Sequence, residues 1–267
     1  MLCTIEILTI GNELLTGKTV NTNATWLAKR ATSLGGLVAR VTTVRDNLTA
    51  IGTAIREILK RKPVILLISG GLGPTFDDMT LQALGNTTKR PLSVNKIALS
   101  MVKQKYRSLA HGRRLPLTKA RRKMAILPKG AEALPNLVGT APGVLLQMGK
   151  STVICLPGVP SELRHIFETS VSGLVSSWSA GFGRNSKSVH ISGVFESEMA
   201  PLIDRVMRRN PGVYIKSHPG SREGRTRSKI ELEFSFESSE PLNAQKEIDC
   251  AIADMLQILP GREKIVK

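Results

Sequence analysis

The first seventy residues alternate short apolar runs with amphipathic segments. Residues 5–10, 38–44 and 64–68 are mainly apolar, rich in β-branched side chains, and typical of buried strands. Between them, residues 21–34 and 48–60 repeat apolar side chains at helical spacing, and Asn or Thr precedes each as a cap. This β-α-β-α-β order predicts an α/β fold: a three-layer αβα, doubly wound, mostly parallel sheet with helices on both faces.

The middle of the chain is less regular. Residues 81–84 and 94–109 show helical spacing, and a weakly patterned basic connection follows to about residue 123. Two apolar runs at residues 144–148 and 152–156 flank a Gly-Lys pair and predict a β-hairpin. Residues 161–178 predict one long closing helix.

The last third predicts a smaller α+β domain with the order strand, helix, strand, strand, helix. Residues 230–236 alternate apolar and polar side chains, which predicts a half-buried strand at the edge of an antiparallel sheet. A small-residue stretch at residues 180–186 predicts the boundary. The expected domains are therefore 1–180 and 187–267.

Composition adds limits to this picture. Hydrophobic residues make up 41% of the chain, and no run of about 18 apolar residues is present, so no membrane span is expected. The start of the chain lacks the basic region of a signal peptide. Cys3, Cys155 and Cys250 are far apart and predict reduced thiols in a cytoplasmic protein, with no disulfide and no zinc site.

The charge is concentrated in one part of the chain. The net charge is +17, and residues 79–131 contain 13 Lys and Arg but no Asp or Glu. Residues 184–267 carry 14 basic and 12 acidic side chains, so the first domain carries most of the positive charge. Such a field attracts phosphates or nucleic acid, although a basic surface that only confers solubility explains it equally well.

The strongest candidate site is the segment GGLGPTFDDMT at residues 70–80, which follows a predicted buried strand and precedes a helix. Glycine lets backbone amides approach an anion closely, and the helix N-terminus adds positive potential. We therefore expect a phosphate to bind here, at residues that carry either bare amides or hydroxyl donors: Gly70, Gly71, Gly73, Thr75 and Thr80.

Two adjacent carboxylates, Asp77 and Asp78, would repel a phosphate unless a cation lies between them. Carboxylate and phosphate oxygens together suit Mg²⁺ or a similar hard divalent ion. The alternative is that one of them, most simply Asp77, caps the following helix. Asp46 lies just past the second predicted strand, at the same sheet edge, and is either a further site acid or a helix cap.

Three other turn-rich segments lie near strand ends. Residues 10–17 contain Gly11, Gly17 and Glu13, a candidate ligand for a metal or a ribose hydroxyl. Asn21 and Asn23 follow, as polar contacts or helix caps. The segments NLVGTAPG at 136–143 and LPGVPSE at 156–162 are by themselves only loops.

Five segments, at residues 10–17, 21–28, 70–80, 136–143 and 156–162, together resemble the CinA family, and the resemblance covers residues 4–170. The wider resemblance is to the molybdenum-cofactor-biosynthesis fold of the MogA and MoeA type, with Asp78 and Asp46 at its acidic positions and Asp77 where an Arg would stand. The resemblance implies that Gly11, Glu13, Asn23, Gly139, Thr140 and Gly158 contribute to one nucleotide site. It also implies that the tail is a KH-like domain and that a nicotinamide-mononucleotide deamidase domain, with its activity, is absent.

For the remaining part, the resemblance implies metal-dependent hydrolysis of ADP-ribose to AMP and ribose 5-phosphate. The expected catalytic and metal-binding residues are Asp78, Asp46 and Asp77, with Mg²⁺, Co²⁺ or Mn²⁺ as the ion and no organic cofactor. We expect a homo-oligomer, with a dimer favoured.

Two alternatives remain at this point. The same loop would serve a molybdopterin-binding protein of molybdenum-cofactor biosynthesis. A KH-like tail would serve a non-catalytic RNA-binding protein. The tail's low net charge and its Gly220–Gly224 spacing, one residue longer than GxxG, argue against nucleic acid as a partner.

Overall fold

The computed structural model describes residues 3–110, 116–179, 183–219, 229–238, 241–259 and 264–266. The chain divides into two compact units, Met1–Ser179 and Ala180–Lys267. The segment Gly220–Gly224, whose spacing was compared with GxxG, lies outside the described residues.

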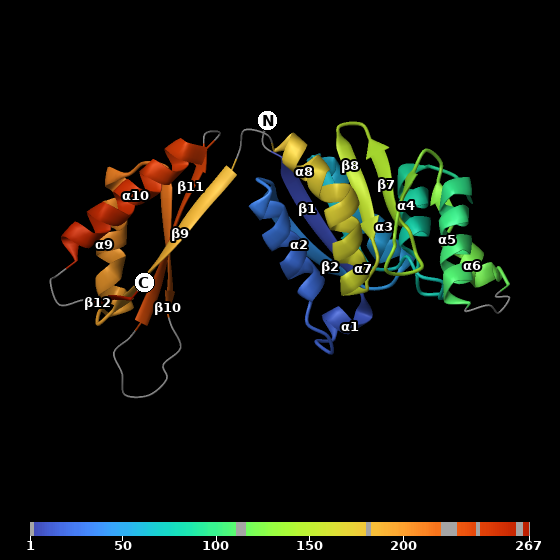
Figure 1. Cartoon of the computed structure of the whole chain (residues 1–267), viewed down its shortest axis with the longest axis horizontal. Coiled ribbons are helices and arrows are strands. Elements are labelled where there is room, and N and C mark those ends of the chain that lie inside the picture. The colour runs from blue at the N-terminus through green and yellow to red at the C-terminus, as the bar shows by residue number, and fades with distance from the viewer. Residues whose placement is uncertain are drawn as a thin grey trace. The chain divides into compact units, whose positions relative to one another are not determined.

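The first unit is built on a six-stranded sheet (Figure 1). Its parallel part is β2 (Leu37–Val44), β1 (Thr4–Ile10), β3 (Ile65–Ser69) and β8 (Ser151–Leu156), in that spatial order. The antiparallel strands β7 (Gly143–Met148) and β6 (Glu132–Leu134) complete it. The mostly parallel sheet and the hairpin of β7 and β8 are therefore confirmed.

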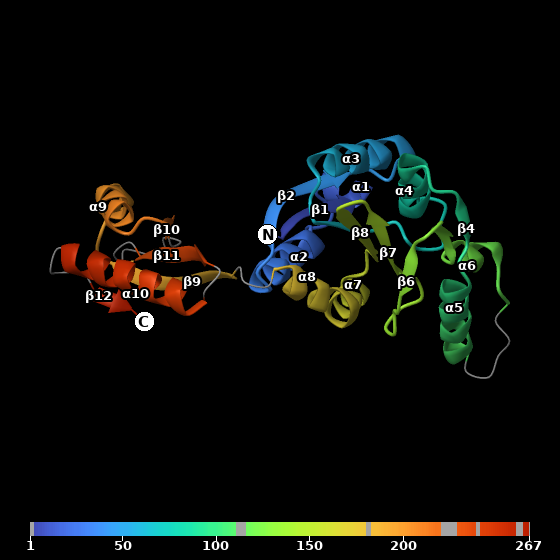
Figure 2. The same cartoon turned by 90° about the horizontal axis from the view of Figure 1, so that it is seen from above.

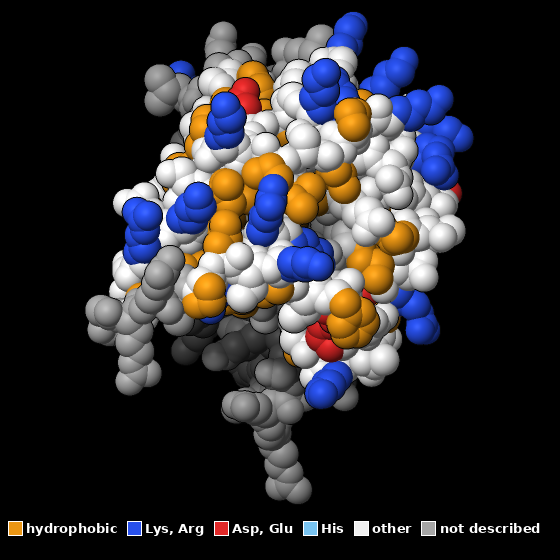
Figure 3. All heavy atoms as spheres, turned by 90° about the vertical axis from the view of Figure 1, so that its right-hand side faces the viewer, with side chains coloured by type: hydrophobic (Ala, Val, Ile, Leu, Met, Phe, Trp, Pro, Cys, Tyr) orange, Lys and Arg blue, Asp and Glu red, His pale blue; other side chains and the backbone are white. Residues whose placement is uncertain are grey.

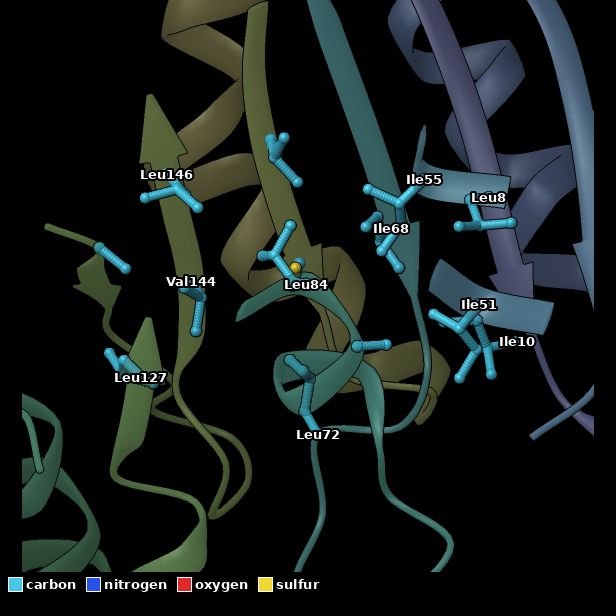
Figure 4. Packing of buried hydrophobic residues seen from close by; sticks show 14 of the residues in the cluster. Leu8, Ile10, Ile51, Ile55, Ile68, Leu72, Leu84, Leu127, Val144 and Leu146 are labelled. Carbon is cyan, nitrogen blue, oxygen red and sulfur yellow. The ribbon is translucent and has the colours of Figure 1, made fainter. Parts of the chain in front are cut away.

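Helices cover both faces of this sheet, as the view in Figure 2 shows. One face carries α2 (Thr22–Ser33), α7 (Pro160–Ile166), the π-helical turn η1 (Phe167–Val171) and α8 (Ser172–Trp178). The other carries α3 (Leu48–Arg61) and α4 (Thr80–Thr88). Side chains alternate along each strand, so Ile5 and Ile7 enter one buried cluster while Leu8 and Ile10 enter the other (Figure 4).

One polar side chain interrupts the apolar pattern of β1. Glu6 is only 4% exposed, and Arg61 at the end of α3 binds both of its oxygens, at 2.8 and 2.6 Å. A buried carboxylate requires a partner of this kind, since an unpaired charge in a protein interior is costly. The interruption in the strand pattern therefore marks an ion pair.

Beyond β6, a smaller group of elements forms the end of the first unit. It contains β4 (Leu92–Val94), α5 (Lys96–Leu109), α6 (Lys119–Lys123) and β5 (Ile126–Pro128), with β4 and β5 paired in a sheet of their own. The expected helix over 94–109 is thus confirmed from Lys96, while Val94 belongs to a strand.

Two local predictions are refined by the structure. Residues 161–178 are helical without a break, as predicted, but the π-helical turn η1 lies between α7 and α8, and there the hydrogen bonding shifts by one residue. A short helix, α1 (Asn12–Leu15), fills the loop after β1. The caps were predicted well: Asn21 accepts from the amide of Ala24, and Asn47 accepts from two amides of α3.

The second unit is an antiparallel sheet in the order β10 (Val213–Pro219), β11 (Lys229–Ser238), β9 (Gly183–Ser192) and β12 (Lys264–Val266). The helices α9 (Glu196–Arg209) and α10 (Pro241–Ile258) share its core with Leu232 and Phe234. The prediction that residues 230–236 form an edge strand is wrong, because β11 pairs on both sides. Alternation of apolar and polar side chains shows that one face of a strand is buried, but it does not show whether the strand has one neighbouring strand or two.

The three cysteines are free thiols. Cys3 and Cys155 are buried, and burial raises the pKa of Cys155 to about 12, whereas Cys250 on α10 is exposed. In the described part of the chain, no helix is long and apolar enough to cross a membrane.

Candidate functional site

Three loops meet at the carboxyl edge of the parallel strands, where ligands bind in open α/β sheets. The amide of Gly70, after β3, donates to the carbonyl of Leu156 at the end of β8 (3.0 Å). Asn23 on α2 donates to Gly158 O (2.7 Å) and to Ser69 Oγ (3.1 Å), which ties β3 and β8 to the helix after β1. The predicted convergence of the loops after β1, β3 and β8 is therefore present.

The glycines at residues 70 and 71 are required by the backbone. Both have positive φ, +106° and +70°, a region that other residues rarely adopt. A Cβ on Gly70 would lie 2.5 Å from Ile10 O, and one on Gly71 would overlap Thr80 Oγ1. These two positions form a tight turn that has no room for a side chain.

Leu72 fixes the orientation of this turn. Its side chain is 4% exposed and points into the cluster that also contains Leu84 and Val144 (Figure 4). Within the described chain, the amides of Gly71, Leu72 and Gly73 donate to no acceptor. Three consecutive free amides around a φ-positive turn form the kind of concavity that binds anions.

Thr75 and the two aspartates form a second cluster on the same loop. Thr75 Oγ1 lies 2.5 Å from both Asp77 Oδ1 and Asp78 Oδ2, and its amide donates to Asp78 Oδ2 at 2.8 Å. Lys123 Nζ donates to Thr75 O. The Thr75 hydroxyl holds the pKa of the Asp77 carboxyl below its usual range, helped by that residue's own amide and by Lys123.

This arrangement changes two predicted roles, the phosphate contact of Thr75 and the helix cap expected of one aspartate. The hydroxyl of Thr75 is engaged by carboxylates and does not face a phosphate. Neither Asp77 nor Asp78 caps α4, which has Met79 at its N-cap and no side-chain cap. Instead, both carboxylates hold the turn at Thr75.

The predicted phosphate contact of Thr80 also needs correction. Its side chain is fully buried, and its hydroxyl donates to Gly70 O at 2.7 Å. Because that hydroxyl has one hydrogen and no exposure, it holds the glycine turn and does not reach a ligand.

Asp46 is placed apart from the other two acids. Its Oδ2 accepts the amide of Asn12 (2.7 Å), so it caps α1 at the end of β1. Within the described residues, no group of three or more His, Cys, Asp or Glu side chains is arranged to hold a metal ion. The set of Asp46, Asp77 and Asp78 is therefore not assembled, and only the pair Asp77 and Asp78 stays together.

A polar cavity of about 120 Å³ lies on the β1 side of the glycine turn. Its walls carry amides, hydroxyls and the single carboxylate of Glu13, which packs over Gly11 and has no hydrogen-bond partner in the described chain. The lining residues are Thr9, Ile10, Glu13, Leu14, Thr19, Val20, Asn21, Thr22, Asn23, Ser69, Gly158 and Pro160.

A second cavity, of about 190 Å³, lies on the other side of the turn. Apolar side chains line most of it, together with one acid and one base, Asp78 and Lys123. The full set is Gly71, Leu72, Gly73, Asp78, Leu81, Gln82, Leu92, Lys123 and Ile126. The turn that carries the free amides therefore borders the second, mainly apolar cavity, whereas the first cavity touches this loop only at Ser69.

Gly139 and Thr140 line neither cavity. A Cβ on Gly139 would overlap the Glu162 carboxylate, which accepts from Asn136 Nδ2 at 2.6 Å. The Thr140 hydroxyl faces the sulfur of Met124 at 3.9 Å. These two predicted ligand contacts instead shape the loop that precedes β7.

Sequence reasoning missed Ser69, Lys123 and the Asn136–Glu162 pair. Ser69 ends the strand before the glycines, so its position was a usable signal. Lys123 reaches the loop from 48 residues downstream, within a run of basic residues that gives no reason to select it. Asn136 and Glu162 lie in two separate motifs whose contact only the fold reveals.

The end of the first unit that carries α5 and α6 is positively charged. Eleven Lys and Arg of residues 79–131 lie in the described part, and none of them forms a salt bridge there. Figure 3 shows Lys and Arg side chains spread over this end, with few acidic ones among them. The charge predicted from the sequence is thus a surface property of this end.

Comparisons with known proteins agree with this geometry. The model of the probable molybdopterin binding domain matches residues 6–176. A crystal structure of the protein CinA, of unknown function, from Thermoplasma acidophilum is 38% identical, with a TM-score of 0.60 over 65% of this chain and 98% of that one. A protein from Metallosphaera sedula is 42% identical over 241 residues, 90% of this chain and 88% of that protein, and one from Pyrobaculum calidifontis is 40% identical over 97% of both.

Proposed function

Because the chain belongs to the family of probable molybdopterin binding domains, and residues 6–176 form a CinA-like domain of the MogA type, we propose that this domain hydrolyses a nucleotide pyrophosphate. The proposed substrate is ADP-ribose, and the products are AMP and ribose 5-phosphate. The proposed location is the cytoplasm.

The free amides of Gly71, Leu72 and Gly73 carry this proposal. Each of the two cavities is smaller than the roughly 300 Å³ or more that encloses a drug-sized ligand. A ligand the size of ADP-ribose would therefore extend beyond either cavity, with its central pyrophosphate on the amides. The buried Leu72 side chain keeps these donors in place before the ligand arrives, which lowers the cost of ordering them.

The polar cavity suits a sugar. Ribose hydroxyls both donate and accept hydrogen bonds, and Glu13 offers a carboxylate without a partner in the described chain. Asn23 uses its amide hydrogens on Ser69 and Gly158, so its carbonyl oxygen remains to accept from a hydroxyl. We place the ribose 5-phosphate half of the substrate in this cavity.

The residues present fit a divalent ion held by two carboxylates. The single hydrogen of the Thr75 hydroxyl cannot serve both Asp77 and Asp78, and the Thr75 amide donates only to Asp78 Oδ2, so each carboxylate keeps lone pairs that could bind a cation. Mg²⁺ is commonly bound by one or two carboxylates plus substrate phosphates. Such an ion, when bound, neutralises phosphate charge and lowers the pKa of water. Lys123 adds a positive charge at the same cavity.

The proposed reaction is a single displacement at phosphorus. The oxygen of water bonds to one phosphorus, and the bond from that phosphorus to the bridging oxygen breaks. The bridging oxygen stays on the departing phosphate, and the protons of water pass to solvent and the products. The amides stabilise the negative charge that builds on the phosphate oxygens.

Purified protein assayed for AMP release from ADP-ribose with Mg²⁺, Co²⁺ or Mn²⁺ tests the proposal. Asp78→Asn should lower kcat by about 100-fold or more, since it removes a negative ligand while keeping an acceptor for the Thr75 amide. Asp46→Asn is the matched control, because its amide oxygen still caps α1. Absence of AMP release with all three metals, or equal losses in the two variants, would contradict the proposal.

The second candidate is molybdopterin binding, which the matched family description favours. Molybdopterin carries a phosphate that the same three amides would bind. Binding titrations distinguish the two functions. Tight binding of molybdopterin together with no binding of ADP-ribose supports molybdopterin binding and contradicts ADP-ribose hydrolysis. Analytical sedimentation of the same purified protein measures its oligomeric state and so tests the expected dimer.

A further inference from the structure

An aromatic ring is fully presented to solvent in the middle of the site loop. Phe76 is 89% exposed, the highest value among the exposed large hydrophobic side chains of the described residues. It belongs to no hydrophobic cluster and to no ring–ring or cation–ring pair in the described chain. Aromatic residues form only 4% of the chain, and this one lies where it contributes nothing to the packing of the core.

The backbone beneath this ring is held firmly. Before it, Thr75 is bound through its amide and hydroxyl by the two aspartates and through its carbonyl by Lys123. After it, the amide of Asp78 donates to Thr75 O at 3.3 Å. The ring therefore makes no contacts, while hydrogen bonds hold the backbone on either side of it. Such a preorganised side chain loses little freedom when it binds a ligand.

The ring stands three residues after the last free amide of the turn, on the loop that also carries Asp77 and Asp78. A phosphate on the amides brings any attached heterocycle close to this loop. Nucleobases and other flat heterocycles stack on aromatic side chains, and an exposed, uncovered face is what such stacking requires.

We propose that Phe76 is a stacking subsite for the heterocycle of the phosphorylated ligand, a purine or a related flat ring. This inference rests on the proposed function, because it assumes that the pyrophosphate lies on the Gly71–Gly73 amides. Stacking uses the π-face that all bases share, so the subsite holds the ring with little regard to its edge groups. The domain should therefore recognise the pyrophosphate and sugar strictly and the base loosely.

Calorimetric titration of the full chain with ADP, GDP and inorganic pyrophosphate in Mg²⁺ tests this subsite. Phe76→Ala should weaken ADP and GDP binding by roughly 5- to 150-fold, and pyrophosphate binding by less than twofold. Phe76→Trp should keep the affinity for ADP, and Phe76→Leu should lose most of it, since leucine is apolar but has no π-face. Phe195→Ala, which removes another exposed phenylalanine (63%) in the second unit, is the control and should change nothing.

The outcomes separate the two proposals. If wild-type protein binds neither pyrophosphate nor ADP, the proposed function fails. If pyrophosphate binds but Phe76→Ala leaves ADP affinity unchanged, or lowers both affinities equally, the stacking subsite alone is overturned. It is overturned as well if Phe76→Ala converts a dimer to a monomer in sedimentation, because a second copy of the chain then covers the ring.

Discussion

Replacing Thr80 by valine distinguishes a residue that supports the loop from one that binds the ligand. The change removes a fully buried hydroxyl that donates to Gly70 O at 2.7 Å and leaves that carbonyl without its donor. A buried group left without its partner costs about 1–3 kcal/mol. For a unit of 179 residues, each kcal/mol lowers Tm by about 2–4 °C, so we expect a fall of roughly 2–12 °C.

Scanning calorimetry of Thr80→Val, with Thr80→Ser as the matched variant, measures this effect. Serine keeps the hydroxyl and should recover most of the lost Tm, whereas a hydroxyl that only touched ligand would leave Tm unchanged in both variants. Pyrophosphate titration of the same proteins completes the test. An unchanged Tm in Thr80→Val, together with lost pyrophosphate binding, would refute the assignment of Thr80 to the scaffold.

Three further outcomes follow from the packing and ion pairs of the structure. Gly139→Ala should lower Tm, because its Cβ would overlap a carboxylate, whereas Gly173→Ala in helix α8 meets nothing within 4 Å and should leave Tm unchanged or slightly raised. A thiol reagent at pH 8 should modify Cys250 alone in the native chain and all three thiols in denaturant; rapid native labelling of more than one thiol would contradict the burial. Arg30 lowers the pKa of Glu168, so this pair stabilises the fold above the ordinary glutamate value of about 4.3 and loses that effect as pH falls below it. Arg30→Gln should therefore be less stable than wild type near pH 7 in urea unfolding at low salt, and the difference should shrink as the pH falls below that value; a difference that stays constant down to pH 3 would count against the pair.

Local patterns predicted the first unit well because each element depends on its own residues. Mainly apolar runs identified β1 and β3, and an asparagine before the helical repeat identified the start of α3. The glycine turn was also readable, since positive φ and the absence of a Cβ leave few other residues possible.

The chemistry of the polar side chains was harder to predict, because a side chain binds whichever group the fold brings near it. Asp46 was expected beside Asp78, and it binds the amide of Asn12 on the neighbouring loop. Thr80 was expected to donate outward, and it donates inward. The sequence shows which hydrogen-bond donors and acceptors are present, and only the folded structure shows which of them already bind other groups of the protein.

The uncompensated lysines and arginines around α5 and α6 affect how quickly a ligand arrives more than how long it stays. A small anion diffusing toward the molecule gains speed from that potential, and dissolved salt largely screens the attraction beyond about 8–10 Å under ordinary buffer conditions. Its residence time, in contrast, depends on short hydrogen bonds to peptide nitrogens, which salt screens little. The association rate constant should therefore decline with ionic strength while the dissociation rate constant stays nearly level.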